Sequence, residues 1–141
     1  MRRCWIWIIL SISAFTVFGC STNQTETEGT ITENNTYLQV SAEEAAGMMA
    51  TENNYVILDV RTLQEYQEGH IPGAICIPNE TIGTEDIPEL PDKDQLILVY
   101  CRSGNRSKQA AHKLVKLGYT NVVEFGGIRD WTGETVTGVE P

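Results

Sequence analysis

The chain has 141 residues, a net charge of −9 at pH 7 and 41% hydrophobic residues. That length fits a single globular domain, and the acidic excess argues against a protein that binds nucleic acid or anionic membrane surfaces through its own charge. The four cysteines are too few and too irregularly placed for a disulfide scaffold, and no Cys/His cluster has metal-ligand spacing. We therefore expect neither a metal nor another cofactor.

The first 20 residues have the pattern of a bacterial export signal. Two arginines at positions 2 and 3 precede an apolar stretch, Cys4–Phe18, which is shorter than the ~20 residues that a membrane-spanning helix needs. The stretch ends in Val17-Phe18-Gly19-Cys20, which resembles the lipobox of bacterial lipoproteins. The resemblance implies that residues 1–19 are a signal peptide and that Cys20 is lipidated. An uncleaved anchor and an ordinary secretory signal remain open.

This reading predicts a protein of the cell envelope, held by its N-terminal lipid at the outer face of the cytoplasmic membrane, or periplasmic if the cell is Gram-negative. Residues 20–36 would then be the lipidated N-terminus followed by a tether. Between residues 21 and 36 the sole apolar residue is Ile31, so this segment cannot bury enough surface to offset its chain entropy, and we expect it to be disordered.

Strand and helix patterns alternate from residue 37 onward. Apolar runs predict strands at 37–40, 55–58, 74–77, 96–100 and 122–124. Helices are predicted at 41–50, at 62–68 and at 107–117, and the acidic segment 79–94 is predicted to be mainly loop. The first two helices begin with capping boxes, Ser41 with Glu44 and Thr62 with Glu65. The alternation favours an α/β fold with a mostly parallel sheet and helices on both faces. We place this domain at residues 37–136, with a C-terminal tail at 137–141.

The candidate reaction centre is a seven-residue stretch between a buried strand and a helix. It consists of Cys101, Arg102, Ser103, Gly104, Asn105, Arg106 and Ser107. A short turn from a strand into a helix directs several backbone N–H groups into one small space, which suits an anion. A cysteine at a helix N-terminus beside cations can have its pKa lowered from about 8.5 to roughly 3.5–7.5. The pattern therefore predicts that Cys101 is a nucleophilic thiolate.

The spacing of the loop separates two kinds of chemistry. Four residues lie between Cys101 and Arg106, whereas protein-tyrosine phosphatases have five, so this loop makes a tighter cradle with less room for phosphate. The spacing, with Gly104 at the turn, resembles the active-site loop of the rhodanese (thiosulfate sulfurtransferase) family. Two further stretches resemble rhodanese signatures. The first consists of Leu58-Asp59-Val60-Arg61, then Glu65 and Tyr66, then Gly69-His70-Ile71-Pro72-Gly73-Ala74. The second consists of Gly126-Gly127-Ile128 and Trp131.

The resemblance covers residues 37 to about 131 and implies a rhodanese domain with five parallel strands. It also implies transfer of sulfane sulfur, through a Cys101 persulfide, from a donor such as thiosulfate to a thiol or cyanide. The partners would be a small sulfur-containing anion and a thiol acceptor, and we expect a monomer. The persulfide would rest among the backbone N–H groups from Arg102 to Ser107. Arg106 would lower the thiol pKa and hold the donor, and Arg102 would meet donor or acceptor at the rim.

Three other functions stay open at this point. The loop could serve a small phosphatase or arsenate reductase-like enzyme, a membrane-tethered, non-catalytic module that binds sulfur anions, or a thiol-redox signal through Cys101. Outside the loop, Asp59 and Arg61 are expected to bond to each other and to the backbone, and His70 to fix its turn. Cys76 is expected to be a small buried residue rather than a resolving thiol.

Overall fold

The protein is described by a computed structural model that covers residues 37–141; the predicted signal peptide, Cys20 and the tether lie outside the described residues. Five strands form one sheet in the order β1-β5-β4-β2-β3, and every neighbouring pair is parallel. The strands are β1 (Leu38–Gln39), β2 (Tyr55–Asp59), β3 (Ala74–Cys76), β4 (Leu96–Cys101) and β5 (Val122–Gly127). The helices are α1 (Ala42–Thr51), α2 (Leu63–Glu68) and α3 (Asn105–Lys116), with 3₁₀ turns η1 (Asn79–Thr81) and η2 (Ile128–Asp130). The predicted α/β class is confirmed.

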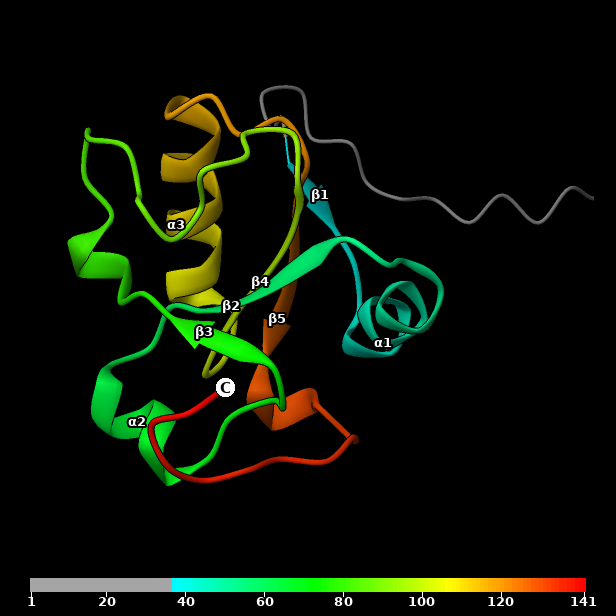
Figure 1. Cartoon of the computed structure of the whole chain (residues 1–141). Coiled ribbons are helices and arrows are strands. Elements are labelled where there is room, and N and C mark those ends of the chain that lie inside the picture. The colour runs from blue at the N-terminus through cyan, green and yellow to red at the C-terminus, as the bar shows by residue number, and fades with distance from the viewer. Residues whose placement is uncertain (1–36) are drawn as a thin grey trace, which may run out of the picture.

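The central strand, β4, is buried along its whole length and carries Cys101 at its carboxyl end. Its side chains alternate between two hydrophobic cores, one on each face of the sheet. Ile97, Val99 and Cys101 pack in the core that contains the inner face of α3, while Leu98 and Tyr100 pack in the core that contains Ala45 of α1 and Tyr66 of α2. Figure 1 shows α3 and α1 on opposite sides of the sheet. Helices therefore cover both faces, as predicted, and burial on both faces explains the unbroken apolar sequence of β4.

The two predicted capping boxes are present. The Ser41 hydroxyl accepts a hydrogen bond from the Glu44 backbone N–H (3.2 Å), and the Thr62 hydroxyl accepts one from the Glu65 N–H (3.2 Å). Each carboxylate accepts in return from the N–H of its cap residue, at 2.7 Å for Ser41 and 3.1 Å for Thr62. These reciprocal bonds satisfy donors that would otherwise be orphaned at the first helical turn.

Helix α3 begins two residues before the predicted start near Ser107. Its N-cap is Gly104, which has a φ of 97° and no side chain to donate or accept, so the usual cap signal is missing from the sequence. Ser107 lies inside the first turn, and its hydroxyl reaches the Glu124 carboxylate of β5. Ser107, the residue at which the helix was predicted to start, therefore links α3 to β5.

The predicted strand at 122–124 is longer in the structure, because β5 continues to Gly127 and pairs Gly127 with Cys101. The β4–β5 register shifts between Val99 and Cys101. After this shift, Gly126 and Gly127 lie beside the Cys101 loop.

The C-terminal segment packs against the end of α2. Val136 pairs with His70 through two backbone hydrogen bonds of 2.8 and 2.9 Å, and the Gly138 N–H donates to the Gln67 carbonyl (3.0 Å). The His70 ring lies 2.8 Å from the Tyr66 carbonyl and 3.0 Å from the Glu140 carbonyl. His70 therefore fixes its turn, as predicted, and also connects that turn to the end of the chain.

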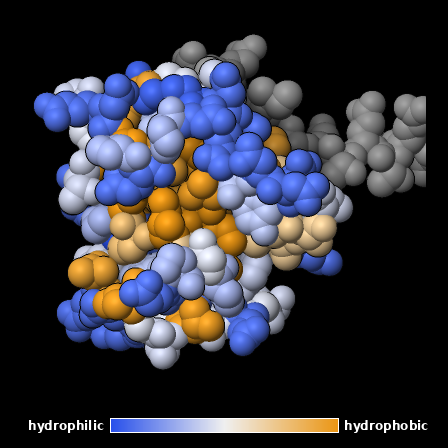
Figure 2. Space-filling view, in the orientation of Figure 1, coloured by the Kyte–Doolittle hydropathy of each residue, from blue (hydrophilic) through white to orange (hydrophobic). Residues whose placement is uncertain are grey.

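The surface is mainly hydrophilic, in keeping with the acidic composition. Figure 2 shows a band of hydrophobic side chains across the middle of the visible face, over β2 and β3, and smaller hydrophobic groups below it. Half-buried Val56, Ile75 and Ile77, which pack against the core on the α3 face, belong to these strands or directly follow them. Within residues 37–141, no helix combines the length and hydropathy needed to span a bilayer.

Candidate active site

Cys101 lies at the floor of the loop between β4 and α3 and is 1% exposed. Its Sγ accepts a hydrogen bond from the backbone N–H of Gly104 at 3.1 Å and lies 3.5 Å from the Ser107 hydroxyl. Gly104 has a left-handed φ of 97°, at the tight turn from the loop into α3. A side chain at that φ would be strained, which explains the glycine.

Opposing effects act on the acidity of the Cys101 thiol. Burial raises its pKa, but the Ser107 hydroxyl and the backbone N–H groups of Ser107, Ser103 and Gly104 stabilise the thiolate more strongly. The net result is a pKa below the ordinary value, as the sequence predicted. The structure therefore supplies a ring of donors around one buried sulfur, suited to a thiolate or to an anion attached to it.

The cradle is closed from below by the glycines of β5. A Cβ on Gly127 would collide with the Arg102 carbonyl oxygen and lie 2.6 Å from the Arg102 carbonyl carbon and the Ser103 Cα. These are backbone atoms that cannot rotate away. The absence of a side chain at Gly127 therefore lets β5 approach the loop closely enough to hold its shape.

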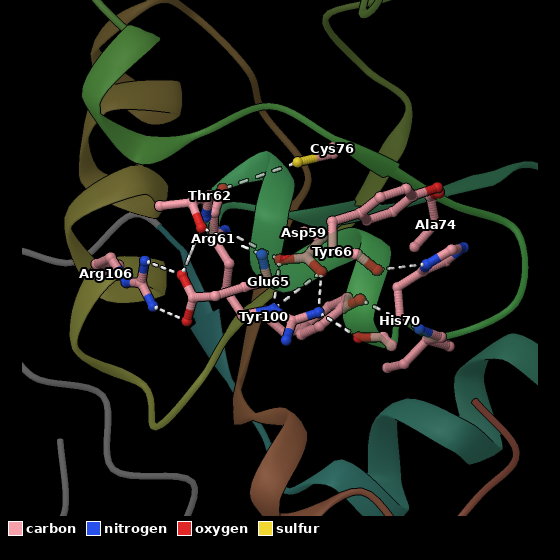
Figure 3. Close-up of polar contacts among 12 residues, drawn as sticks. Asp59, Arg61, Thr62, Glu65, Tyr66, His70, Ala74, Cys76, Tyr100 and Arg106 are labelled. Carbon is pink, nitrogen blue, oxygen red and sulfur yellow. Dashed lines mark hydrogen bonds and ion pairs between the residues drawn. The ribbon is translucent and has the colours of Figure 1, made fainter. Parts of the chain in front are cut away.

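Arg106 does not reach the sulfur as a free cation. Its guanidinium binds the Glu65 carboxylate through two hydrogen bonds of 2.7 and 2.8 Å, which Figure 3 shows between α3 and α2. The Arg106 hydrogen bonds are the main reason that the pKa of Glu65 falls to about 2, although burial opposes the shift. Arg106 still interacts electrostatically with Cys101, but most of its charge is directed to Glu65.

A buried ion pair supports the loop on its other side. Asp59, at the carboxyl end of β2, bonds to the Arg61 side chain at 2.6 to 3.0 Å and to the Arg61 backbone N–H at 2.9 Å. Arg61 also donates to the Gly69 carbonyl (2.7 Å) and lies over the ring of Tyr100 (Figure 3). The predicted structural role of this pair is confirmed.

The remaining loop residues lie at the surface. Arg102, Ser103 and Asn105 are exposed. Arg102 lines a pocket of about 360 Å³ together with Glu65, Glu68 and Arg129 of η2. Within residues 37–141, the side chains of Arg102 and Arg129 form no hydrogen bond and no ion pair. Two unpaired guanidinium groups therefore lie at the entrance to the loop.

The second described cysteine is chemically different from Cys101. Cys76 is half-buried at the end of β3, and burial is the main cause that raises its pKa to about 11. Such a thiol stays protonated near neutral pH, which fits the predicted packing role better than that of a resolving thiol. The described part of the chain holds no group of three or more His, Cys, Asp or Glu residues that could bind a metal.

Comparison with known proteins decides the family. A family model described as a rhodanese-like domain matches residues 41–134. The chain belongs to this family. A thiosulfate sulfurtransferase of Escherichia coli, PspE, is 40% identical over 73 residues, which cover 52% of this chain and 70% of that protein. A putative sulfur carrier protein of Bacillus subtilis, YrkF, is 36% identical over 98 residues, which cover 69% of this chain and 52% of that protein. The chain thus spans about half the length of the Bacillus relative.

Solved rhodanese structures agree with the architecture. A rhodanese from Escherichia coli, solved with anions, is 37% identical and aligns with a TM-score of 0.55, covering 60% of this chain and 99% of the other. The rhodanese fold inferred from the loop and its two flanking signatures is therefore confirmed.

Sequence reasoning missed two residues near the loop. Arg129 gave no signal, because an arginine after Gly126-Gly127-Ile128 looks like any solvated charge. Glu124 did give one: it is an acidic residue within the apolar run of β5 and is 2% exposed. A charge in such a run has to find partners on the sheet face, and here those partners lie next to Cys101.

Proposed function

We propose that the protein is a sulfurtransferase that carries sulfane sulfur as a persulfide on Cys101. The observation that best supports this is the buried Sγ, with Gly104 N–H at 3.1 Å and a pKa lowered by hydrogen bonds. Names of relatives point the same way, since PspE of Escherichia coli is a thiosulfate sulfurtransferase.

The reaction proceeds in two displacements. The Cys101 thiolate attacks the outer sulfur of thiosulfate, the new Cys101 S–S bond forms, and the S–S bond of thiosulfate breaks as sulfite leaves with the bonding pair. The anionic outer sulfur of the persulfide is then stabilised by the preorganised N–H groups of the loop. A thiolate acceptor or cyanide attacks that sulfur, and the Cys101 thiolate leaves and is ready for another cycle.

The two arginines of the loop, Arg102 and Arg106, have different roles in this reaction. Arg102, exposed and without a partner in the described residues, receives the anionic donor or acceptor at the rim. Arg106 contributes the part of its charge that Glu65 does not neutralise. Donor and acceptor are therefore selected mainly by charge and size. In this proposal the protein acts as a monomer.

The decisive experiment is to incubate the purified chain with thiosulfate, weigh it and measure sulfite. We expect a gain of one sulfur atom, release of one sulfite, and loss of both in Cys101→Ser, because a serine hydroxyl is far less acidic than the thiol. Cys76→Ser is the matched control and should keep full transfer. Transfer above a few per cent in Cys101→Ser would refute the assignment. Binding of thiosulfate without sulfite release would instead indicate a non-catalytic module. Hydrolysis of a phosphate ester, measured in a separate assay, would indicate a phosphatase.

The location of the protein is part of this proposal. The apolar stretch before Val17-Phe18-Gly19-Cys20 supports export and lipidation of Cys20, and residues 21–36 would connect the lipid to the domain. The sulfurtransferase would then work in the cell envelope, at the outer face of the cytoplasmic membrane or in a Gram-negative periplasm.

A further inference from the structure

Glu124 is a buried carboxylate whose side chain has no cationic partner among residues 37–141. One carboxylate oxygen accepts from the Gly126 backbone N–H at 2.9 Å and lies 2.5 Å from the Ser107 hydroxyl; the other accepts from the Gln39 amide at 3.3 Å. All three donors are neutral. Among the described residues, neutral hydrogen bonds alone hold this carboxylate.

Ser107 connects this carboxylate to the nucleophile. Its Oγ lies 2.5 Å from Glu124 and 3.5 Å from the Cys101 sulfur, with the carbonyls of Gly104 and Gly126 at 3.0 and 3.3 Å. A hydroxyl has one proton to donate, and the shortest contact directs it to the carboxylate. The Cys101 thiol can then donate to Oγ, which completes a hydrogen-bonded chain from sulfur to carboxylate.

We propose that Glu124 takes up, through Ser107, the proton that Cys101 gives up when its thiolate forms. The S–H proton moves to Ser107 Oγ while the Oγ–H proton moves to the Glu124 carboxylate. The products are a thiolate, a neutral carboxylic acid and a serine hydroxyl that now donates to the sulfur. The number of protons is unchanged, and no other reactant takes part. Glu124 acts through Ser107, so it is a positioning residue.

The surroundings of Cys101 leave this role open to Glu124. The N–H groups of the loop stabilise a thiolate, but they cannot accept its proton. Arg106 is a cation and is already bound to Glu65, so it cannot accept one either. Among its hydrogen-bond partners from β1, α3 and β5, Glu124 meets no titratable group. Neutralising Glu124 also removes a negative charge from beside the thiolate, which lowers the cost of forming it.

The inference deepens the proposed function, because it concerns how the nucleophile of that reaction ionises. Its test needs no sulfur donor: the rate of Cys101 alkylation by iodoacetamide is measured by mass spectrometry from pH 4 to 10, in a Cys76→Ser background. Since two coupled groups share one proton, the parent profile should rise in two steps at least about one pH unit apart. Glu124→Gln should give a single step, and Glu43→Gln, an exposed change on α1, should keep two.

A second pair of variants tests the path through Ser107. Ser107→Ala should also give one step, and adding Glu124→Gln to it should change nothing further, because the connection is already lost. If Glu124→Gln shifts the profile equally with and without Ser107, its charge acts through space and the proposal is wrong. A single step in the parent protein would overturn it as well. If Glu124→Gln does not fold, Ser107→Ala alone decides.

The outcomes also separate this inference from the proposed function. A two-step profile in a protein that transfers no sulfur would overturn the proposed function and leave the role of Glu124 intact. Sulfur transfer by a protein with a single-step profile would support the proposed function and overturn the role of Glu124.

Discussion

At the scale of single residues, Gly127 has the least freedom to change. We expect Gly127→Ala to lower the free energy of unfolding by about 1–3 kcal/mol, because its Cβ would meet the backbone of Arg102 and Ser103. Sulfur transfer should fall at least tenfold as the loop is displaced. Urea unfolding and initial rates measure the two effects.

Gly47→Ala is the matched control for this change. A Cβ at Gly47 meets open space on α1, and alanine in a helix interior is favoured over glycine by about 0.5–1 kcal/mol. It should stabilise the protein slightly and leave transfer unchanged. If Gly127→Ala behaves like Gly47→Ala, close approach of β5 does not shape the loop.

Residues whose roles follow from neighbours in sequence could be predicted, and residues whose roles follow from neighbours in space could not. Cys101 and Gly104 were predictable because a strand, a tight turn and a helix start are consecutive in the chain. The contact between Glu124 and Ser107 depends on β5 lying next to β4, which is a property of the sheet order. The pairing of Arg106 with Glu65 was missed for the same reason, since 41 residues separate them.

At the scale of elements, the Glu65–Arg106 pair joins α2 to α3. Glu65→Gln should lower the free energy of unfolding at pH 7 by about 1–2 kcal/mol, a modest value because both side chains are about a quarter exposed. Glutamine can still cap α2, so the change isolates the ion pair. Urea unfolding at several pH values measures it, with exposed Glu68→Gln as the control on the same helix.

The same pair has a defined pH dependence. The pKa of Glu65 is about 2 in the folded protein against an ordinary value of 4.5, so the folded state favours the ionised form. Its contribution is therefore complete above pH 4.5 and is lost as the pH falls from 4.5 toward 2. The difference in stability between the parent protein and Glu65→Gln should narrow over that interval. A difference that stays constant from pH 7 to 3 would contradict the assigned cause.

Element types were predictable from periodicity and caps, while element ends were less so. The capping boxes located the starts of α1 and α2 because side chains make those caps. The start of α3 was misplaced because a glycine in a left-handed conformation makes that cap, and nothing in a glycine distinguishes this use from an ordinary turn.

At the scale of the whole molecule, the predicted anchor gives a test of location. The parent protein should be found in the membrane fraction, since two acyl chains on one residue anchor stably whereas a single chain is marginal. Cys20→Ala should release the protein or leave its signal peptide uncleaved. Fractionation followed by mass measurement of the N-terminus checks both. A parent protein found wholly in the cytoplasm would rule the anchor out.

The order of the strands also determines which pairings must form before the Cys101 site is complete. No two neighbours in this all-parallel sheet can be joined by a tight hairpin, so each pairing requires distant parts of the chain to meet first. Folds dominated by such long-range pairings form more slowly than those built from local contacts. The N–H groups around Cys101 come from consecutive residues, but Gly127 and the Glu124 carboxylate come from β5 and reach the loop only when β5 pairs with β4. We therefore expect Cys101 to be an ordinary cysteine in the unfolded chain and to gain its full reactivity only when the sheet is complete.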